Sequence, residues 1–147
     1  MTDRSKVKTV TQVKSNQTCE NKRQALSQIK RINWKSLDFR TKNQKSFYQT
    51  IGRNDVTFSV GPAGCGKTYL ATYYALKNLA QGKYENMIIT KPLVEVDGEK
   101  LGFLPGDIDE KTAPYMMSLY YNMEQIIGKA RLEVLKKSGV VKVIPLA

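Results

Sequence analysis

Residues 61–68 have the residue types and spacing of a phosphate-binding loop, in the order Gly61-Pro62-Ala63-Gly64-Cys65-Gly66-Lys67-Thr68. Two glycines five positions apart are followed by a lysine and a hydroxyl residue. Small residues let a triphosphate come close to backbone N–H groups. A lysine ammonium can neutralise the β- and γ-phosphates, and a threonine hydroxyl is a hard-oxygen ligand for Mg²⁺. The pattern therefore predicts a nucleotide-binding loop.

The stretches on either side must position this loop. Residues 55–60 alternate and are rich in β-forming residues, which predicts a strand. Residues 68–81 are rich in Ala, Leu and Tyr and stop at Gly82, which predicts a helix. A helix that starts at the loop directs its positive end at a bound anion. Strand, loop and helix in this order favour a ligand site over the alternative, a glycine-rich turn that binds nothing.

The rest of the chain predicts an α/β domain. The stretch Tyr69–Glu85 is long enough for a crossover helix, so the strands over 55–60 and 86–91 should be parallel. The other expected elements are a helix from Thr41 or Asn43 to Gly52, a buried strand over 86–91, a loop over 94–106, helices over 112–127 and 130–138, and a strand over 140–145.

The charge of the chain is uneven. Residues 1–45 carry 12 Lys or Arg against 3 Asp or Glu, whereas residues 46–147 carry 12 against 10. Residues 1–35 are also poor in apolar side chains, so we expect a basic, largely disordered arm with a short helix near 20–31. Trp34, Leu37 and Phe39 are the first expected anchors onto the folded part. The arm either neutralises nucleic-acid phosphates or is a solvated segment with no specific partner.

Several classes of site and setting are disfavoured. The chain has no histidine, which excludes His-based catalysis and His-ligated metal sites. Its two cysteines, Cys19 and Cys65, do not indicate a disulfide framework, and Cys65 fits its loop as a small residue better than as a redox switch. Neither a membrane span nor a signal peptide is visible, which favours a cytoplasmic protein.

Several motifs together resemble one known family. They are residues 61–71, Thr90-Lys91-Pro92, Glu95, residues 98–107, and Glu110-Lys111 with Pro114-Tyr115 and Leu119-Tyr120. The chain is similar, from about Thr41 to Ala147, to the PhoH family, the phosphate-starvation-inducible-type ATPases that many phages also carry. The string from Gly102 to Asp107 is far more specific to that family than the phosphate loop.

The resemblance implies a RecA-like P-loop NTPase over residues 36–147, with a parallel sheet flanked by helices. It implies binding of ATP and Mg²⁺, coupling to RNA or DNA, and leaves room for a homo-oligomer. Carried over by position, Gln44 would read adenine, Thr68 would bind Mg²⁺, and Lys91 would touch a nucleic-acid backbone. Cys65 replaces the usual Thr or Ser. The nucleotide-binding residues would be Gln44, Gly61, Pro62, Ala63, Gly64, Cys65, Gly66, Lys67, Thr68 and Tyr69.

One departure from the family concerns catalysis. In the family, an acidic motif that positions Mg²⁺ and the attacking water follows the strand that resembles residues 140–145, and this chain ends at Ala147. Phosphoryl transfer needs such charges in line with the phosphate. We therefore expect an incomplete domain that does not hydrolyse ATP alone, and we assign no catalytic residue. We also expect residues 55–60 to have an unpaired edge and an exposed apolar face.

Two other functions stay open at this point. The first is a non-catalytic nucleic-acid-binding module that uses the basic arm and Lys91. The second is a small-molecule kinase or GTPase on the same loop. The second is disfavoured because the Asn-Lys-x-Asp guanine signature is absent and the string from Gly102 to Asp107 has no place in such proteins.

Overall fold

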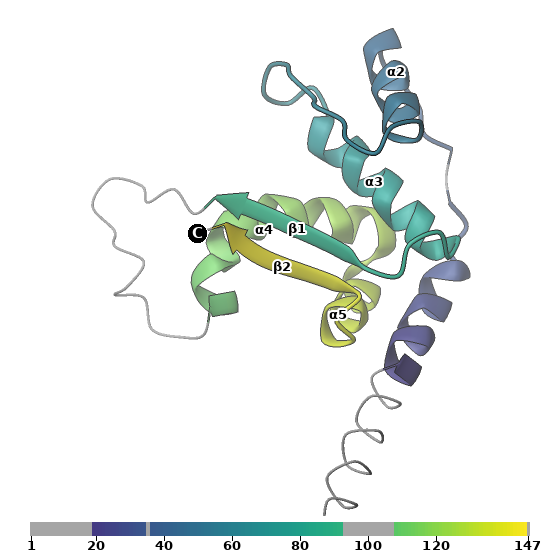
Figure 1. The fold of residues 1–147 in the computed structure, drawn as a ribbon, viewed down its shortest axis with the longest axis vertical. Helices are drawn as coiled ribbons and strands as arrows, with labels where there is room; N and C mark the ends of the chain where they lie inside the picture. Colours follow the sequence, from purple (N-terminus) through teal and green to yellow (C-terminus); the bar gives the residue numbers. More distant parts are fainter. Residues whose placement is uncertain (1–18, 35, 93–107, 147) are drawn as a thin grey trace, which may run out of the picture.

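The computed structural model describes residues 19–34, 36–92 and 108–146, with the side chains of residues 91–92, 108–115 and 145–146 excepted. This part of the chain is an α/β unit with a small parallel sheet (Figure 1). Its elements are a helix over residues 19–30, α2 (Lys42–Ile51), α3 (Lys67–Ala80), β1 (Met87–Pro92), α4 (Ile108–Ile127), α5 (Lys129–Lys137) and β2 (Val141–Leu146).

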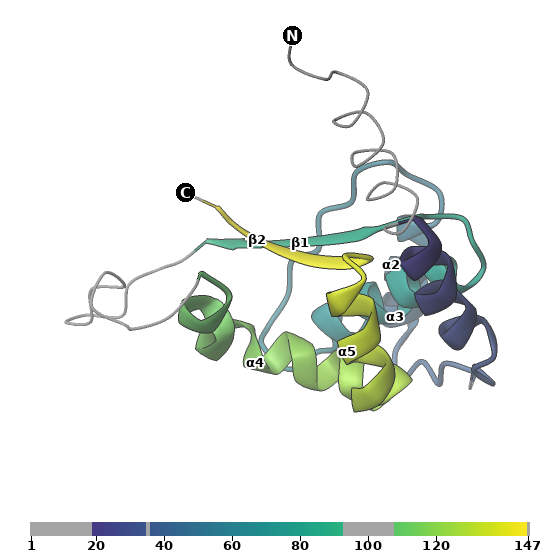
Figure 2. The ribbon, with the colours of Figure 1, turned by 90° about the horizontal axis from the view of Figure 1, so that it is seen from below.

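The sheet consists of β1 and β2, paired in parallel from Met87 opposite Val141 to Pro92 opposite Leu146. In Figure 2, helices α3, α4 and α5 lie on one side of the two strands. The other face is open to solvent, since Ile88 is 59% exposed and Ile144 is 46% exposed. The expected strand over 86–91 is thus confirmed as a strand, but it is half-buried rather than buried. A parallel strand becomes fully apolar in its surroundings only where helices cover both faces.

The hydrophobic core lies between these helices and the covered face of the sheet. α3, α4 and α5 each direct apolar side chains into it at helical spacing, such as Leu76 with Leu79 and Leu132 with Leu135. The buried cluster comprises Ala25, Ile29, Leu76, Leu79, Ala80, Met123, Ile127, Leu132, Leu135, Val140 and Val141.

The helix over residues 19–30 belongs to this core. Ala25 is 1% exposed and Ile29 is 0% exposed, one helical turn apart on the same face. The expected short helix near 20–31 is therefore confirmed, and residues 1–18 of the expected arm lie outside the described residues. Leu26 and Ile32 also pack against the core, so this segment docks through several apolar side chains. Trp34 also packs on the core, with its ring edge-on to Tyr73 at 5.5 Å between centroids, as expected for an anchor.

Residues 55–60 are the main correction to the expected fold, because they do not form a strand. Val56, Phe58 and Val60 are 70%, 89% and 98% exposed, respectively. The alternation expected for a strand is present, with Thr57 less exposed than its neighbours. The only sheet of the described residues is β1 with β2, so no parallel pairing with residues 86–91 forms. A strand needs a neighbour for its backbone N–H and C=O groups.

The exposed apolar face that was expected for residues 55–60 is confirmed by the exposure of Val56, Phe58 and Val60.

The other helices agree with the expected ones to within a few residues. α2 begins at the predicted cap, where the Thr41 hydroxyl accepts a hydrogen bond from the Gln44 backbone N–H at 3.2 Å. α3 stops just before Gly82, which has a φ of +74°. α4 begins at Ile108, four residues before the expected start. The expected loop over 94–106 lies outside the described residues.

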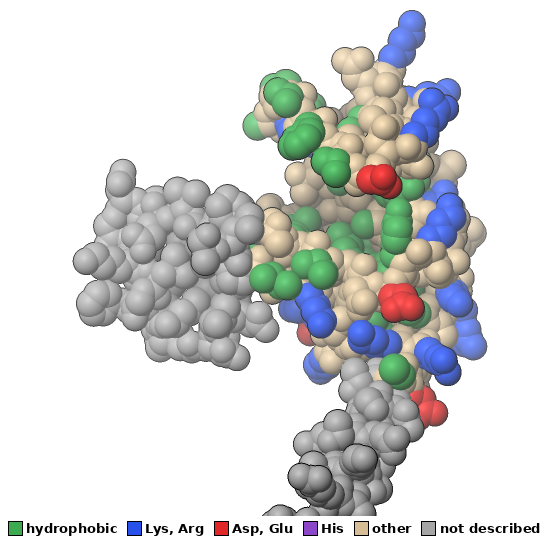
Figure 3. Space-filling model, viewed as in Figure 1, with side chains coloured by type: hydrophobic (Ala, Val, Ile, Leu, Met, Phe, Trp, Pro, Cys, Tyr) green, Lys and Arg blue, Asp and Glu red, His purple; other side chains and the backbone are tan. Residues whose placement is uncertain are grey.

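Charged side chains are unevenly placed on the surface. In Figure 3, Lys and Arg side chains gather along one side of the molecule, and acidic side chains are few and scattered. Within the described part of the chain, no helix is both long and apolar enough to cross a membrane.

Candidate functional site

The predicted phosphate loop joins residues 55–60 to the start of α3. Gly64 has a φ of +77° and Gly66 a φ of +88°, the left-handed region that side chains disfavour. A Cβ atom at Gly64 would have nothing within 4 Å, so a side chain would fit in the space there. Glycine is favoured at this position by the left-handed backbone conformation and not by packing. Gly66 is the N-cap of α3, and no side chain caps this helix end. An uncapped helix N-terminus preceded by such glycines is suited to an anion.

The ammonium group of Lys67 lies inside the loop. Its Nζ donates hydrogen bonds to the backbone carbonyls of Gly61 at 2.8 Å and Pro62 at 2.6 Å. It also lies 3.5 Å from the Cys65 sulfur. A triphosphate entering the loop must exchange these carbonyls for phosphate oxygens, which make stronger, charge-assisted bonds to an ammonium. Lys67 is thus already placed at the centre of the loop.

Cys65 fills a narrow space between Lys67 and Gly61. A Cβ atom added at Gly61 would lie 3.5 Å from the Cys65 sulfur. The half-buried position leaves room for a small side chain. The expectation that Cys65 is present because a small residue is needed there, and not as a redox switch, stays a prediction.

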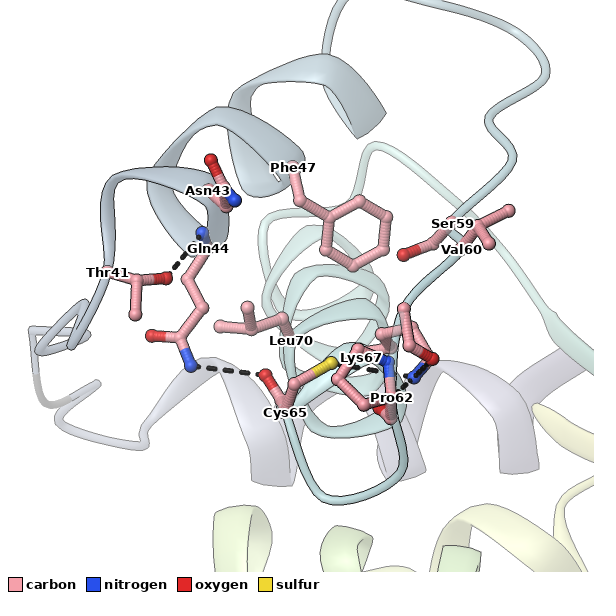
Figure 4. Close-up of a pocket in the computed structure, with 11 residues that line it drawn as sticks. Thr41, Asn43, Gln44, Phe47, Ser59, Val60, Pro62, Cys65, Lys67 and Leu70 are labelled. Carbon is pink, nitrogen blue, oxygen red and sulfur yellow. Dashed lines mark hydrogen bonds between the residues drawn. The ribbon is translucent and has the colours of Figure 1, made fainter.

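A pocket of about 340 Å³ opens between α2 and the loop (Figure 4). That volume lies within the range of small-molecule sites in proteins. The walls are apolar at Phe47, Val60 and Leu70, and Lys67 lies at the edge of the pocket. The complete lining is Thr41, Asn43, Gln44, Phe47, Ser59, Val60, Gly61, Pro62, Cys65, Lys67 and Leu70.

Gln44 forms a bridge between the start of α2 and the loop. Its Oε1 accepts from the Arg40 backbone N–H at 2.8 Å, and its Nε2 donates to the Cys65 carbonyl at 3.2 Å. In Figure 4 the side chain extends from α2 towards Cys65. Thr41 and Gln44 have the spacing of a capping box, in which the third residue of a helix bonds back to the chain before it. We call the two hydrogen bonds of the Gln44 side chain, from the Arg40 N–H and to the Cys65 carbonyl, the Gln44 bridge.

A second hollow of about 300 Å³ lies on the other side of Gln44. Gln44 and Leu70 line both spaces. The other residues around the second hollow are Leu37, Asp38, Arg40, Gly64, Gly66 and Tyr69. Sequence reasoning did not assign Arg40, Asn43, Phe47 or Ser59 to the site. The Thr-x-x-Gln spacing of a capping box indicates that the Gln44 side chain turns back to the start of its helix, but it predicts the N–H of Thr41 as the donor, whereas the donor is that of Arg40.

Aromatic rings hold α2 against α3. The Tyr48 ring lies 5.3 Å from that of Tyr74 and 6.4 Å from that of Tyr73, and Phe39 packs on it at 5.6 Å. Burial raises the pKa of the Tyr48 phenol, and the neighbouring Tyr73 and Tyr74 add to the rise. Burial also raises the pKa of Tyr73, with a smaller contribution from Tyr69. This aromatic junction sets the distance between the pocket wall and the helix that carries Lys67.

The remaining predicted site residues are less enclosed. Thr68 is exposed, and Tyr69 is 38% exposed. Pro62 and Ala63 are exposed parts of the loop. The described residues contain no cluster of three or more acidic, Cys or His groups that could hold a metal. The contact of Thr68 with Mg²⁺ stays a prediction. Lys91 lies at the end of β1 opposite Pro145, and its side chain is outside the described part.

Comparison with known protein families shows to which family the chain belongs. The model of the PhoH-like protein family matches residues 36–147, which is most of the chain. The chain belongs to the PhoH-like family. The match covers α2, the phosphate loop, α3, both strands, α4 and α5, whereas the helix over residues 19–30 lies before it.

Curated PhoH-like relatives align with the same region. The chain is 42% identical over 113 residues to a PhoH-like protein of Bacillus subtilis, and 41% over 108 residues to one of Synechocystis. It is 34% identical over 110 residues to Protein PhoH of Escherichia coli K12. These alignments cover 77%, 74% and 74% of the chain but only 35%, 33% and 31% of the relatives. The chain thus matches about a third of their length. No solved structure matches the fold.

Proposed function

We propose that this PhoH-like chain binds a nucleoside triphosphate, with ATP as the nucleotide that the family resemblance implies, on a RecA-like P-loop fold. The observation that carries the proposal is the Lys67 ammonium enclosed by a loop with left-handed Gly64 and Gly66. The ammonium that these carbonyls hold is the group to which phosphate oxygens would bind in their place. The family match supports the same loop as a nucleotide site.

The proposed roles follow the chemistry of each residue. Backbone N–H groups of residues 62–68 receive the phosphate oxygens, Lys67 neutralises their charge, and Thr68 supplies a hydroxyl to Mg²⁺. When bound, Mg²⁺ would offset further phosphate charge. The adenine contact that the resemblance assigns to Gln44 stays a prediction, and so does hydrolysis, for which we assign no residue.

A Lys67→Ala substitution tests the proposal. Replacing the ammonium should weaken ATP binding about ten- to hundredfold, because hydrogen bonds to charged groups contribute roughly 1.5–3 kcal/mol. Isothermal titration calorimetry of the 147-residue chain with Mg-ATP measures this. Lys83→Ala removes an exposed lysine just beyond α3 and serves as the matched control. Equal ATP affinity in wild type and Lys67→Ala would rule out the site.

A second candidate function is nucleic-acid binding, favoured by the gathering of Lys and Arg along one side of the molecule. Binding of this kind weakens steeply with added salt because counterions are released. Fluorescence anisotropy with single-stranded RNA and DNA, at two salt concentrations and with or without ATP, measures it. A protein that lacks residues 1–18 keeps the helix over 19–30 and separates the arm from the folded surface. Affinity that does not change with salt would contradict this function.

A further inference from the structure

The Gln44 side chain uses both ends of its amide within the protein. Its oxygen accepts from the Arg40 N–H at 2.8 Å and its nitrogen donates to the Cys65 carbonyl at 3.2 Å. An amide has one acceptor end and one donor end. Because the two backbone partners are a donor and an acceptor, only one orientation of the amide satisfies both.

The bridge joins two segments that are distant in sequence. Gln44 lies 21 residues before Cys65. Its Nε2 atom would lie 3.4 Å from a Cβ atom at Gly66, so it also lies closely against the left-handed N-cap of α3. Cys65 and Gly66 are the two residues that directly precede Lys67. A group that fixes them therefore fixes where the Lys67 ammonium stands.

We propose that Gln44 is a positioning residue of the phosphate loop: its amide ties the Cys65 carbonyl to the start of α2 and thereby sets the place of Lys67. The part of this inference that concerns nucleotides rests on the proposed function. Gln44 lines both hollows, so its positioning role must be separated by experiment from the adenine contact that the family resemblance predicts for it.

A positioning residue and a base reader differ in how their loss changes the affinity for a ligand that has no base. Loss of a loop-positioning bond weakens every ligand with a triphosphate by the same factor. Loss of a base contact weakens ATP and leaves inorganic tripolyphosphate unchanged. The comparison of ATP, GTP and tripolyphosphate separates the two roles.

The Gln44→Glu substitution removes one bond of the bridge and keeps the other. A carboxylate keeps an oxygen for the Arg40 N–H, and Glu is as suitable as Gln in a capping box. It loses the donor to the Cys65 carbonyl and sets a negative charge against that oxygen. Gln49→Glu makes the same chemical change at an exposed position of α2 and is the matched control.

The first measurement needs no ligand. Alkylation of Cys65 by iodoacetamide, followed by intact mass in a Cys19→Ser background, reports how often the loop opens. Gln44→Glu should raise the alkylation rate about five- to tenfold, the factor that corresponds to one hydrogen bond of roughly 1 kcal/mol. Gln49→Glu should not. An unchanged rate in Gln44→Glu would overturn the inference.

The second measurement is calorimetric titration of the same variants, and of Gln44→Met, with Mg-ATP, Mg-GTP and tripolyphosphate. Gln44→Met removes the amide without adding a negative charge near the phosphates. It should lower all three affinities by a similar factor, whereas a loss confined to ATP would make Gln44 a base reader and overturn the inference. If wild type binds none of these ligands while the alkylation rate still rises in Gln44→Glu, the bridge stands and the proposed function fails.

Discussion

Leu76 and Leu135, in the body of the molecule, expose 0% of their surface, whereas Phe58 and Val60, just before the phosphate loop, expose 89% and 98%. The body comprises the helix over residues 19–30, α3, α4, α5, β1 and β2. The loop region comprises α2 and residues 52–66, and none of its residues is buried. Apolar packing holds the body together. Hydrogen bonds, glycine conformations and the aromatic junction hold the loop region, so the two should respond differently to substitution.

The largest expected effect lies in the body. Leu135→Ala removes a fully buried side chain and should lower the free energy of unfolding by about 2–5 kcal/mol, from lost burial and a cavity. Urea denaturation followed by circular dichroism measures it. Leu135→Met nearly conserves volume and should cost less than about 1.5 kcal/mol. A Leu135→Ala protein as stable as wild type would show that the body is not held by its core.

Gly66→Ala should combine a moderate loss of stability with loss of function. The left-handed φ of +88° disfavours a Cβ atom by about 1–2 kcal/mol, so the loop should shift and ATP should bind more weakly. Gly82→Ala is the matched control, since Gly82 has a φ of +74° but lies at the far end of α3. Both variants should lose similar stability, and calorimetry should find weaker ATP binding only in Gly66→Ala. Equal binding by the two would contradict a special role for this loop conformation.

A smaller effect concerns the aromatic junction at alkaline pH. The raised pKa of Tyr48 means that the folded protein holds this proton more tightly than the unfolded chain does. The corresponding stability is fully present below the unfolded pKa of about 10 and is lost as the pH rises through and above that value. Tyr48→Phe should therefore flatten the fall in unfolding free energy between about pH 9 and 11.

Urea denaturation at a series of pH values measures that slope for wild type and Tyr48→Phe. Tyr121→Phe removes a phenol that is 62% exposed and serves as the control. If Tyr48→Phe and wild type lose stability with the same slope, the junction does not contribute through its protonation.

The smallest expected effect is at the exposed face before the loop. Phe58→Ser should change the free energy of unfolding by less than about 0.5 kcal/mol, because its ring is 89% exposed in the folded protein. Thermal and urea unfolding measure it. A loss above about 1 kcal/mol would mean that residues 55–60 pack against something in solution, and sedimentation velocity would then show whether a second copy covers them.

Sequence reasoning placed most helices and both strands of the sheet, because helical periodicity, glycine stops and β-branched runs are local signals. Its prediction of a strand over residues 55–60 was wrong, because their alternation is that of a strand but a strand also needs a partner in space. The loop was recognised from its glycines and lysine. Its packing against Arg40 and Phe47 was not, since nothing near residue 40 in the sequence indicates what residue 65 will contact.

The helix over residues 19–30 has a practical consequence for shortening the protein. The family match begins at residue 36, which makes that residue a natural place to cut. Such a cut would remove Ala25 and Ile29, whose surfaces are 1% and 0% exposed. It would expose the apolar core side chains that they cover. A version that starts near residue 19 keeps the helix over residues 19–30 on the core and should be the more stable sample for biochemistry.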